Sequence, residues 1–162
     1  MCIRDSPEWL WQATLEACLG NTGELPGRRF PRVFLSHAVV DEAVLMPAVD
    51  YLRRISQRPF FLCGDSIGSG AAWQPTIIQQ LKEAQRFLFV LSEASARSTF
   101  CAFEVGQAMA RDIPIGLVAI DDTPPPAYLQ HLQLIHIDRL QRQRPWLSKE
   151  EALIEAMLQG CS

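Results

Sequence analysis

Short apolar runs alternate with amphipathic stretches along most of the chain. The runs "RVFLSH", "PFFLCGD", "RFLFVLS", "IPIGLVAI" and "LIHID" are typical of buried parallel strands. Between them, apolar residues recur every three or four positions, which predicts helices in "VDEAVLMPAVDYLRRISQ", "WQPTIIQQLKEAQ" and "STFCAFEVGQAMARD". A last helix is expected after "RQRPWL", where Ser148 and Glu151 have the spacing of a capping box. The alternation predicts an α/β fold, a flavodoxin-like doubly wound sheet of five parallel strands in the order 2-1-3-4-5, with helices on both faces.

The first 29 residues have a different pattern and are expected to form an N-terminal helix and a linker. In "SPEWLWQATLEACLG", Ser6 suits an N-cap and Gly20 suits a helix end. The turn-rich stretch "NTGELPGRR" follows, so residues 1–29 are assigned to this extension and residues 30–162 to the main domain.

Composition narrows the class of protein. Hydrophobic residues make up 48% of the 162 positions and charged residues 20%, which allows one domain with a full core. The net charge of −3, without a basic stripe, argues against nucleic acid or a membrane surface as a partner. No apolar stretch approaches the roughly 18 residues of a membrane span. Five cysteines without a CxxC spacing are expected to be free thiols, and a cytoplasmic location is expected.

Polar residues follow the predicted strands at their carboxyl ends. Ser36 and His37 end the first strand, Asp65 follows the second, and Ser92 follows the third. The next helix carries Glu104 within an otherwise apolar run. In open parallel sheets the ligand crevice lies beyond these strand ends, so the polar groups are expected to converge there.

Several familiar sites are not supported by the motifs. The chain has neither GxGxxG nor GxxxxGK[ST], and "GDSIG" lacks the residue order of a nucleophile elbow, which disfavours Ser66 as a nucleophile. His37, His131 and His136 have no metal-ligand spacing to one another or to cysteine, so no metal site is expected. His136 alternates within a strand and is interpreted as a structural histidine with satisfied hydrogen bonds.

Three ordered boxes resemble the Toll/interleukin-1 receptor (TIR) domain family over roughly residues 31 to 138. "FLSH" resembles the first-strand box of that family. Asp65, a glycine-containing loop and Trp73 resemble its second-strand box and BB loop. Ser98-Thr99-Phe100-Cys101-x-x-Glu104 resembles its Ser-x-Trp-Cys-x-x-Glu segment, with Phe100 in place of the tryptophan.

The resemblance implies an activity and a set of site residues. Many bacterial and plant members of the family cleave NAD+ at the nicotinamide glycosidic bond with the glutamate that Glu104 matches. Catalysis is therefore expected of Glu104, with NAD+ as substrate and no further cofactor. Substrate binding is expected of the matching residues Phe34, Ser36, His37, Ala38, Asp65, Trp73, Ser98 and Phe100.

The chemistry of this cleavage is consistent with one carboxylate. Phe100 and Glu104 lie four residues apart and share a helix face. Positive charge grows on the ribose in an oxocarbenium-like transition state, which a carboxylate stabilises, and nicotinamide leaves neutral without a general acid. Structural roles remain open: Glu104 as a helix-start carboxylate, Phe100 and Trp73 as packing residues, and Ser36, His37 and Asp65 as caps.

Three functions stay open at this point. The first is an NAD+ hydrolase or cyclase of the kind found in bacterial antiphage systems such as Thoeris, where the product signals to a separate effector protein. In the family, activity commonly depends on self-association through the BB loop, here residues 65–73. The second is a non-catalytic TIR adaptor that acts by association of TIR domains. The third is a nucleoside deoxyribosyltransferase, which shares the sheet and a catalytic glutamate.

Overall fold

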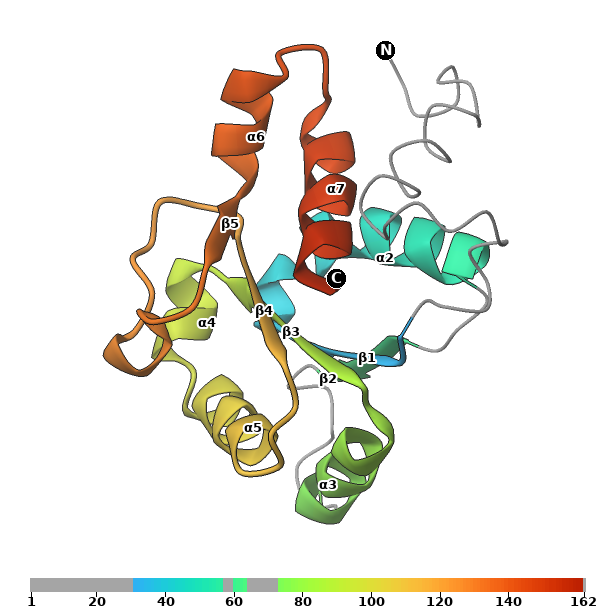
Figure 1. Ribbon diagram of the computed structural model, residues 1–162, viewed down its shortest axis with the longest axis vertical. Helices are drawn as coiled ribbons and strands as arrows, with labels where there is room; N and C mark the ends of the chain where they lie inside the picture. Colours follow the sequence, from blue (N-terminus) through green and yellow to red (C-terminus); the bar gives the residue numbers. More distant parts are fainter. Residues whose placement is uncertain (1–30, 57–59, 64–72, 162) are drawn as a thin grey trace.

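The computed structural model describes residues 31–56, 60–63 and 73–161. The expected N-terminal helix, the linker and most of the BB loop lie outside these residues. Figure 1 shows the elements in chain order, and their bounds are β1 Val33–Ser36, η3 Val39–Asp41, α2 Glu42–Ser56, β2 Phe60–Cys63, α3 Trp73–Glu83, β3 Arg86–Leu91, α4 Glu93–Arg97, α5 Thr99–Met109, β4 Ile115–Ala119, η4 Ala127–Leu129, β5 Leu134–His136, α6 Ile137–Gln143 and α7 Lys149–Cys161.

The sheet has the strand order β2-β1-β3-β4-β5, which is the order that the sequence predicts. Every neighbouring pair is parallel, with Val33 beside Phe60 on one side and beside Arg86 on the other. Because each connection returns to the amino end of the next strand, all carboxyl ends lie along one edge. Polar groups that follow the strands are therefore brought to the same rim.

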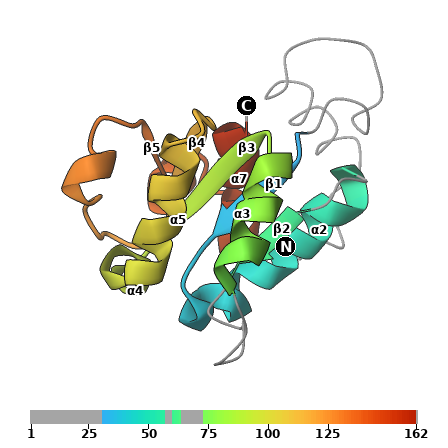
Figure 2. The same ribbon diagram turned by 90° about the horizontal axis from the view of Figure 1, so that it is seen from below.

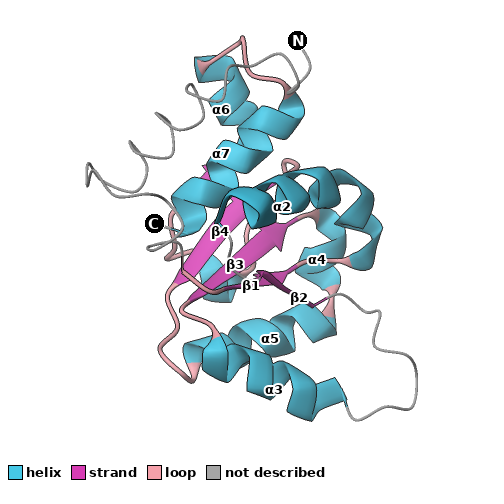
Figure 3. Ribbon diagram, turned by 90° about the vertical axis from the view of Figure 1, so that its right-hand side faces the viewer, coloured by secondary structure: helices cyan, strands magenta, loops and turns pink. Residues whose placement is uncertain are grey.

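Helices cover both faces of the sheet (Figures 2 and 3). On one face α3 and α5 pack over a core that includes Phe34, Phe87 and Phe89. On the other face α2, α6 and α7 enclose a second core that includes Leu35 and Val90. Neighbouring residues of one strand thus enter opposite cores, as the two-residue period of a strand requires.

This alternation decides where the polar end of β1 points. Phe34 lies fully buried on the α5 face, where its ring stacks on Phe87 with centroids 5.4 Å apart. Ser36 follows by one period and faces the same side, toward α5. His37 reaches Glu42 of α2, with Nε2 and Oε1 3.5 Å apart. The two polar residues therefore belong to different sides of the rim.

The start of α7 confirms the capping box predicted from the sequence. The Ser148 main-chain N–H donates to Glu151 Oε2 at 2.7 Å, and the Glu151 N–H donates to Ser148 Oγ at 3.1 Å. Beyond this cap α7 is buried almost throughout, including Glu155, which pairs with Arg144 at 2.5 Å. The buried carboxylate is thus offset by a cation from the preceding loop.

Two helices depart from the sequence prediction. The strand predicted over residues 134–138 ends at His136, and Ile137 and Asp138 instead begin α6. The short helix α4 occupies residues 93–97, where no helix was expected. Ser92 and Ser95 form a reciprocal cap at its start, and local side-chain bonds of this kind leave no trace in hydrophobic periodicity.

Cys101 and Cys161 are buried and are not in disulfide bonds, which agrees with the sequence prediction for these two cysteines. Burial raises the pKa of the Cys161 thiol to about 12, although Arg86 acts in the opposite direction. Since the thiolate is the reactive form, Cys161 is expected to resist alkylation by iodoacetamide at pH 8.5 in the native protein and to react in urea. Peptide mass spectrometry would measure this, and equal alkylation in both states would contradict the burial.

Among the described residues, the structure has no helix that is long and apolar enough to span a membrane.

Candidate functional site

The carboxylate of Glu104 lies at the carboxyl end of β1. Glu104 is a residue of helix α5, which packs on the sheet, and Ser36 Oγ at the end of β1 donates a hydrogen bond to Glu104 Oε2 at 2.5 Å. Both residues are fully buried. Residues 68 positions apart in the chain thus meet at the edge where doubly wound sheets bind ligands. In this arrangement Glu104 is enclosed by protein, so the carboxylate can contact a substrate only after neighbouring groups move.

The other residues of the first-strand box take different positions. Phe34 lies in the core beneath the rim. His37 and Ala38 are buried at the end of β1, and His37 faces α2 rather than Glu104. The structure therefore joins Ser36 to Glu104 and directs Phe34 and His37 elsewhere.

In the segment around Glu104, two residues have visible structural roles. Ser98 is the N-cap of α5, and its hydroxyl accepts from the Cys101 N–H at 3.2 Å. Phe100 is half-buried and packs against the core on the α5 face. Capping and packing are sufficient to fix the start of α5, and hence the position of Glu104 one turn later.

Two expected site residues are not placed by the structure. Asp65 lies outside the described residues, as does the rest of the BB loop up to residue 72. Trp73 begins α3, but its side chain is outside the described part of the chain. Their roles stay predictions.

Sequence reasoning missed a second contact across the rim. Ser92 Oγ donates to Asp41 Oδ2 at 2.6 Å, which ties the loop after β1 to the loop after β3. The sequence identifies Ser92 as a strand-end residue, but nothing in it indicates Asp41 as the partner, since 51 positions separate the two residues. The two residues line an open surface pocket of about 430 Å³, together with Glu93, Ala94, Arg97 and Asp121.

Among the acidic residues that line this pocket, Asp121 has a pKa shifted from its ordinary value. Its burial raises the pKa, but hydrogen bonds from the Thr123 side chain and from the main chain of Glu93 and Thr123, together with the electrostatic effect of nearby His136, hold the pKa below its ordinary value. Asp121 Oδ2 accepts from the Glu93 N–H at 3.0 Å and Oδ1 from the Thr123 N–H at 2.9 Å. These bonds fasten the loop after β4 to the start of α4. Glu104 lines neither this pocket nor a second open pocket beside α6, which Asp122, Asp138, Gln141, Arg142 and Pro145 line.

The buried pair of Ser36 and Glu104 makes a stability prediction. Ser36→Ala is expected to lower the free energy of unfolding by about 1–3 kcal/mol, because a buried acceptor loses its donor. Replacing both partners, as Ser36→Ala with Glu104→Leu, is expected to recover part of that loss, because the buried carboxylate that has lost its donor is removed as well. Urea unfolding of the three proteins measures this. A double variant less stable than Ser36→Ala alone would contradict it.

Comparison with known proteins agrees with this architecture. The family model described as "TIR domain" matches residues 33–154, which include β1, the Glu104 segment and the first six residues of α7. The chain therefore belongs to the TIR domain family. A search of curated protein sequences finds no match.

A solved structure shares the fold. The TIR domain of the Toll-related receptor TRR-2 from Hydra magnipapillata superimposes with a TM-score of 0.55 and 14% identity. The match covers 70% of this chain and 90% of the receptor domain. At this level of identity the likeness concerns the fold alone.

Proposed function

We propose that this protein is an NAD+-cleaving TIR domain in which Glu104 acts on the nicotinamide ribose. The observation that carries the proposal is the pairing of Glu104 with Ser36 at the carboxyl end of β1. It holds the one carboxylate that matches the family's catalytic glutamate at the ligand-binding edge of the sheet. His37 lies on the other side of the rim, where its Nε2 is 3.5 Å from Glu42 Oε1, and it has no part in this proposal.

The reaction breaks the bond between the ribose C1′ and the nicotinamide nitrogen. Nicotinamide takes the electron pair and leaves neutral, while positive charge develops on the sugar. Glu104 stabilises that charge, most strongly if water is excluded around it. Water then adds to C1′ and releases a proton, which gives ADP-ribose. If an adenine nitrogen or another acceptor adds instead, the product is a cyclic or conjugated ADP-ribose.

Burial of Glu104 adds a condition to this proposal. The carboxylate must be uncovered before a ribose can approach, and in the family assembly of TIR domains commonly accompanies activity. The rate of NAD+ cleavage per chain is therefore expected to rise with protein concentration. Nicotinamide released at several protein concentrations, measured by chromatography, tests this. A per-chain rate that is constant over a hundredfold range of concentration would contradict it.

A non-catalytic adaptor is the second candidate, and the full burial of Glu104 favours it. In an adaptor the pair with Ser36 would serve only the packing of α5 on β1. The two functions differ in one measurement. The enzyme releases nicotinamide from NAD+ at high protein concentration, whereas the adaptor associates with itself or with another TIR domain and leaves NAD+ intact.

Under this proposal, the biological role depends on which product NAD+ cleavage gives. A diffusible cyclic or conjugated ADP-ribose would act as a signal to a separate effector protein in bacterial antiphage immunity. ADP-ribose alone would instead indicate simple depletion of NAD+. Mass spectrometry of the reaction mixture distinguishes the two, because the cyclic product is lighter than ADP-ribose by one water.

A further inference from the structure

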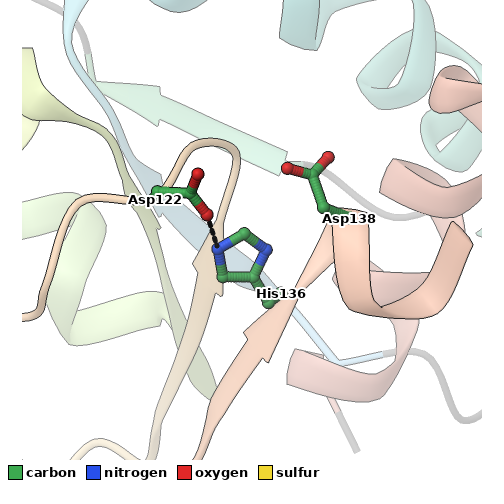
Figure 4. Close-up of side chains that lie close together, drawn as sticks. All are labelled: Asp122, His136 and Asp138. Atoms are coloured by element: carbon green, nitrogen blue, oxygen red, sulfur yellow. Dashed lines mark ion pairs between the residues drawn. The ribbon is translucent and has the colours of Figure 1, made fainter. Parts of the chain in front are cut away.

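A second group of chemistry-bearing side chains lies at the opposite end of the rim. Asp122 follows β4, His136 ends β5, and Asp138 is in the first turn of α6. Each residue brings one potential ligand atom to within 4.8 Å of the other two. Figure 4 shows the imidazole with the Asp122 carboxylate on one side and the Asp138 carboxylate on the other.

The imidazole of His136 is incompletely bonded by the protein. Its Nε2 lies 3.4 Å from Asp122 Oδ1, which is longer than a normal hydrogen bond. Its Nδ1 is buried and has no hydrogen-bond partner in the structure. The histidine that was expected to be fully satisfied therefore has a lone pair or a proton without a partner. Buried polar atoms of this kind call for an explanation such as an ion.

We infer that Asp122, His136 and Asp138 form a binding site for a divalent transition-metal ion. Two carboxylates and one imidazole supply the oxygen and nitrogen donors that Zn²⁺ and Mn²⁺ accept. Together the carboxylates place two negative charges beside the ring, which a divalent cation offsets. Three protein ligands leave coordination positions open for water or an anion.

Metal binding requires the three side chains to approach one another. Ligand atoms around an ion at 2.0–2.2 Å lie about 3–3.5 Å apart, so a separation of 4.8 Å must shorten by about 1.3–1.8 Å. The Asp122 side chain is 93% exposed and free to rotate toward the ring. The nearby cation, Arg142, donates its Nε–H to the main-chain carbonyl of Asp138 at 3.3 Å rather than to the carboxylate. Both carboxylates also line an open surface pocket with Gln141, Arg142 and Pro145, so the site is reached from solvent.

Ligand spacing in the sequence gave no sign of this site. Only His136 and Asp138 are close in the chain, and their side chains come together because the strand ends at His136 and α6 begins at once. Asp122 joins them because β4 pairs with β5, which brings the loop after β4 alongside. The sheet topology therefore creates the cluster.

The test is metal binding by the full chain, reduced and stripped of metal with a chelator. Mn²⁺ is the first probe, and its binding is monitored by electron paramagnetic resonance, because Mn²⁺ prefers oxygen ligands to cysteine thiols. Zn²⁺ is titrated in parallel by calorimetry. The wild type is expected to bind about one ion per chain with a rise in melting temperature. Asp122→Asn, His136→Gln and Asp138→Asn are each expected to weaken binding more than about tenfold.

His131→Gln is the matched control, because this exposed histidine lies in the same loop region outside the cluster. It is expected to bind both ions like the wild type. Melting curves without metal show whether each variant is folded. No binding by the wild type at millimolar metal, or unchanged binding in the three cluster variants, would overturn the inference. The readout is independent of NAD+ cleavage, so failure of the proposed function leaves this test intact.

Discussion

Glu104→Gln is expected to lower the rate of nicotinamide release from NAD+ by a factor of about 100 to 1,000. Glutamine has nearly the same shape, and its amide oxygen can still accept the hydrogen bond from Ser36, which keeps α5 in place. It carries no negative charge, so it cannot stabilise the cation that forms on the ribose. The loss should therefore appear in catalysis and not in folding.

The measurement is the initial rate of nicotinamide release at saturating NAD+, with thermal melting of each protein alongside. Glu83→Gln is the matched control, since it removes one negative charge from an exposed position at the end of α3. That variant should keep the wild-type rate. Equal rates for Glu104→Gln and wild type, with both folded, would remove Glu104 from the mechanism.

Gly116→Ala is expected to lower the free energy of unfolding by about 3 kcal/mol, at the upper end of the range for overpacked cores. Strand β4 and helix α7 touch at Gly116 and Gly160, and a Cβ at residue 116 would lie 2.1 Å from the Gly160 carbonyl oxygen. Because the obstacle is main chain, it cannot swing aside as a side chain would. Helix and strand must separate, and the core that includes Leu88 and Val118 loses contact.

Gly106→Ala provides the contrast for this prediction. Gly106 lies in α5 with nothing within 4 Å of an added Cβ, and alanine favours a helix over glycine by about 0.5–1 kcal/mol. Thermal melting should therefore show a fall of about 6–12 °C for Gly116→Ala and a small rise for Gly106→Ala. Equal melting temperatures for wild type and Gly116→Ala would mean that β4 and α7 are not in such close contact.

The fold was predictable because its determinants repeat along the chain. Buried parallel strands are apolar on both faces, so "RFLFVL" stands out, and right-handed connections then restrict the strand order. The cap of α7 was predictable from Ser148 and Glu151 because both partners lie within one turn. Local signals failed where a strand continued directly into a helix, as at His136, because Ile137 and Asp138 still fit the alternation of a strand.

The site was predictable only in part, for a different reason. Strand ends and one motif indicated Ser36 and Glu104, and the structure brings them together. Which face each residue takes depends on the alternation along β1, and this sends His37 toward α2. Contacts between distant segments, such as Asp41 with Ser92, have no local signal in the sequence. Nor does the sequence reveal that Glu104 is enclosed, since burial is a property of the assembled layers.

The proposed function requires that the Glu104 carboxylate contact the nicotinamide ribose. A crystal structure with a carbocyclic NAD+ analogue, which cannot form the ribosyl cation and is not cleaved, measures this directly. We expect a Glu104 oxygen to lie within about 4 Å of the ring carbon that carries nicotinamide, with the groups that now enclose Ser36 and Glu104 moved aside. An analogue bound elsewhere, with Glu104 still enclosed beside Ser36, would contradict it.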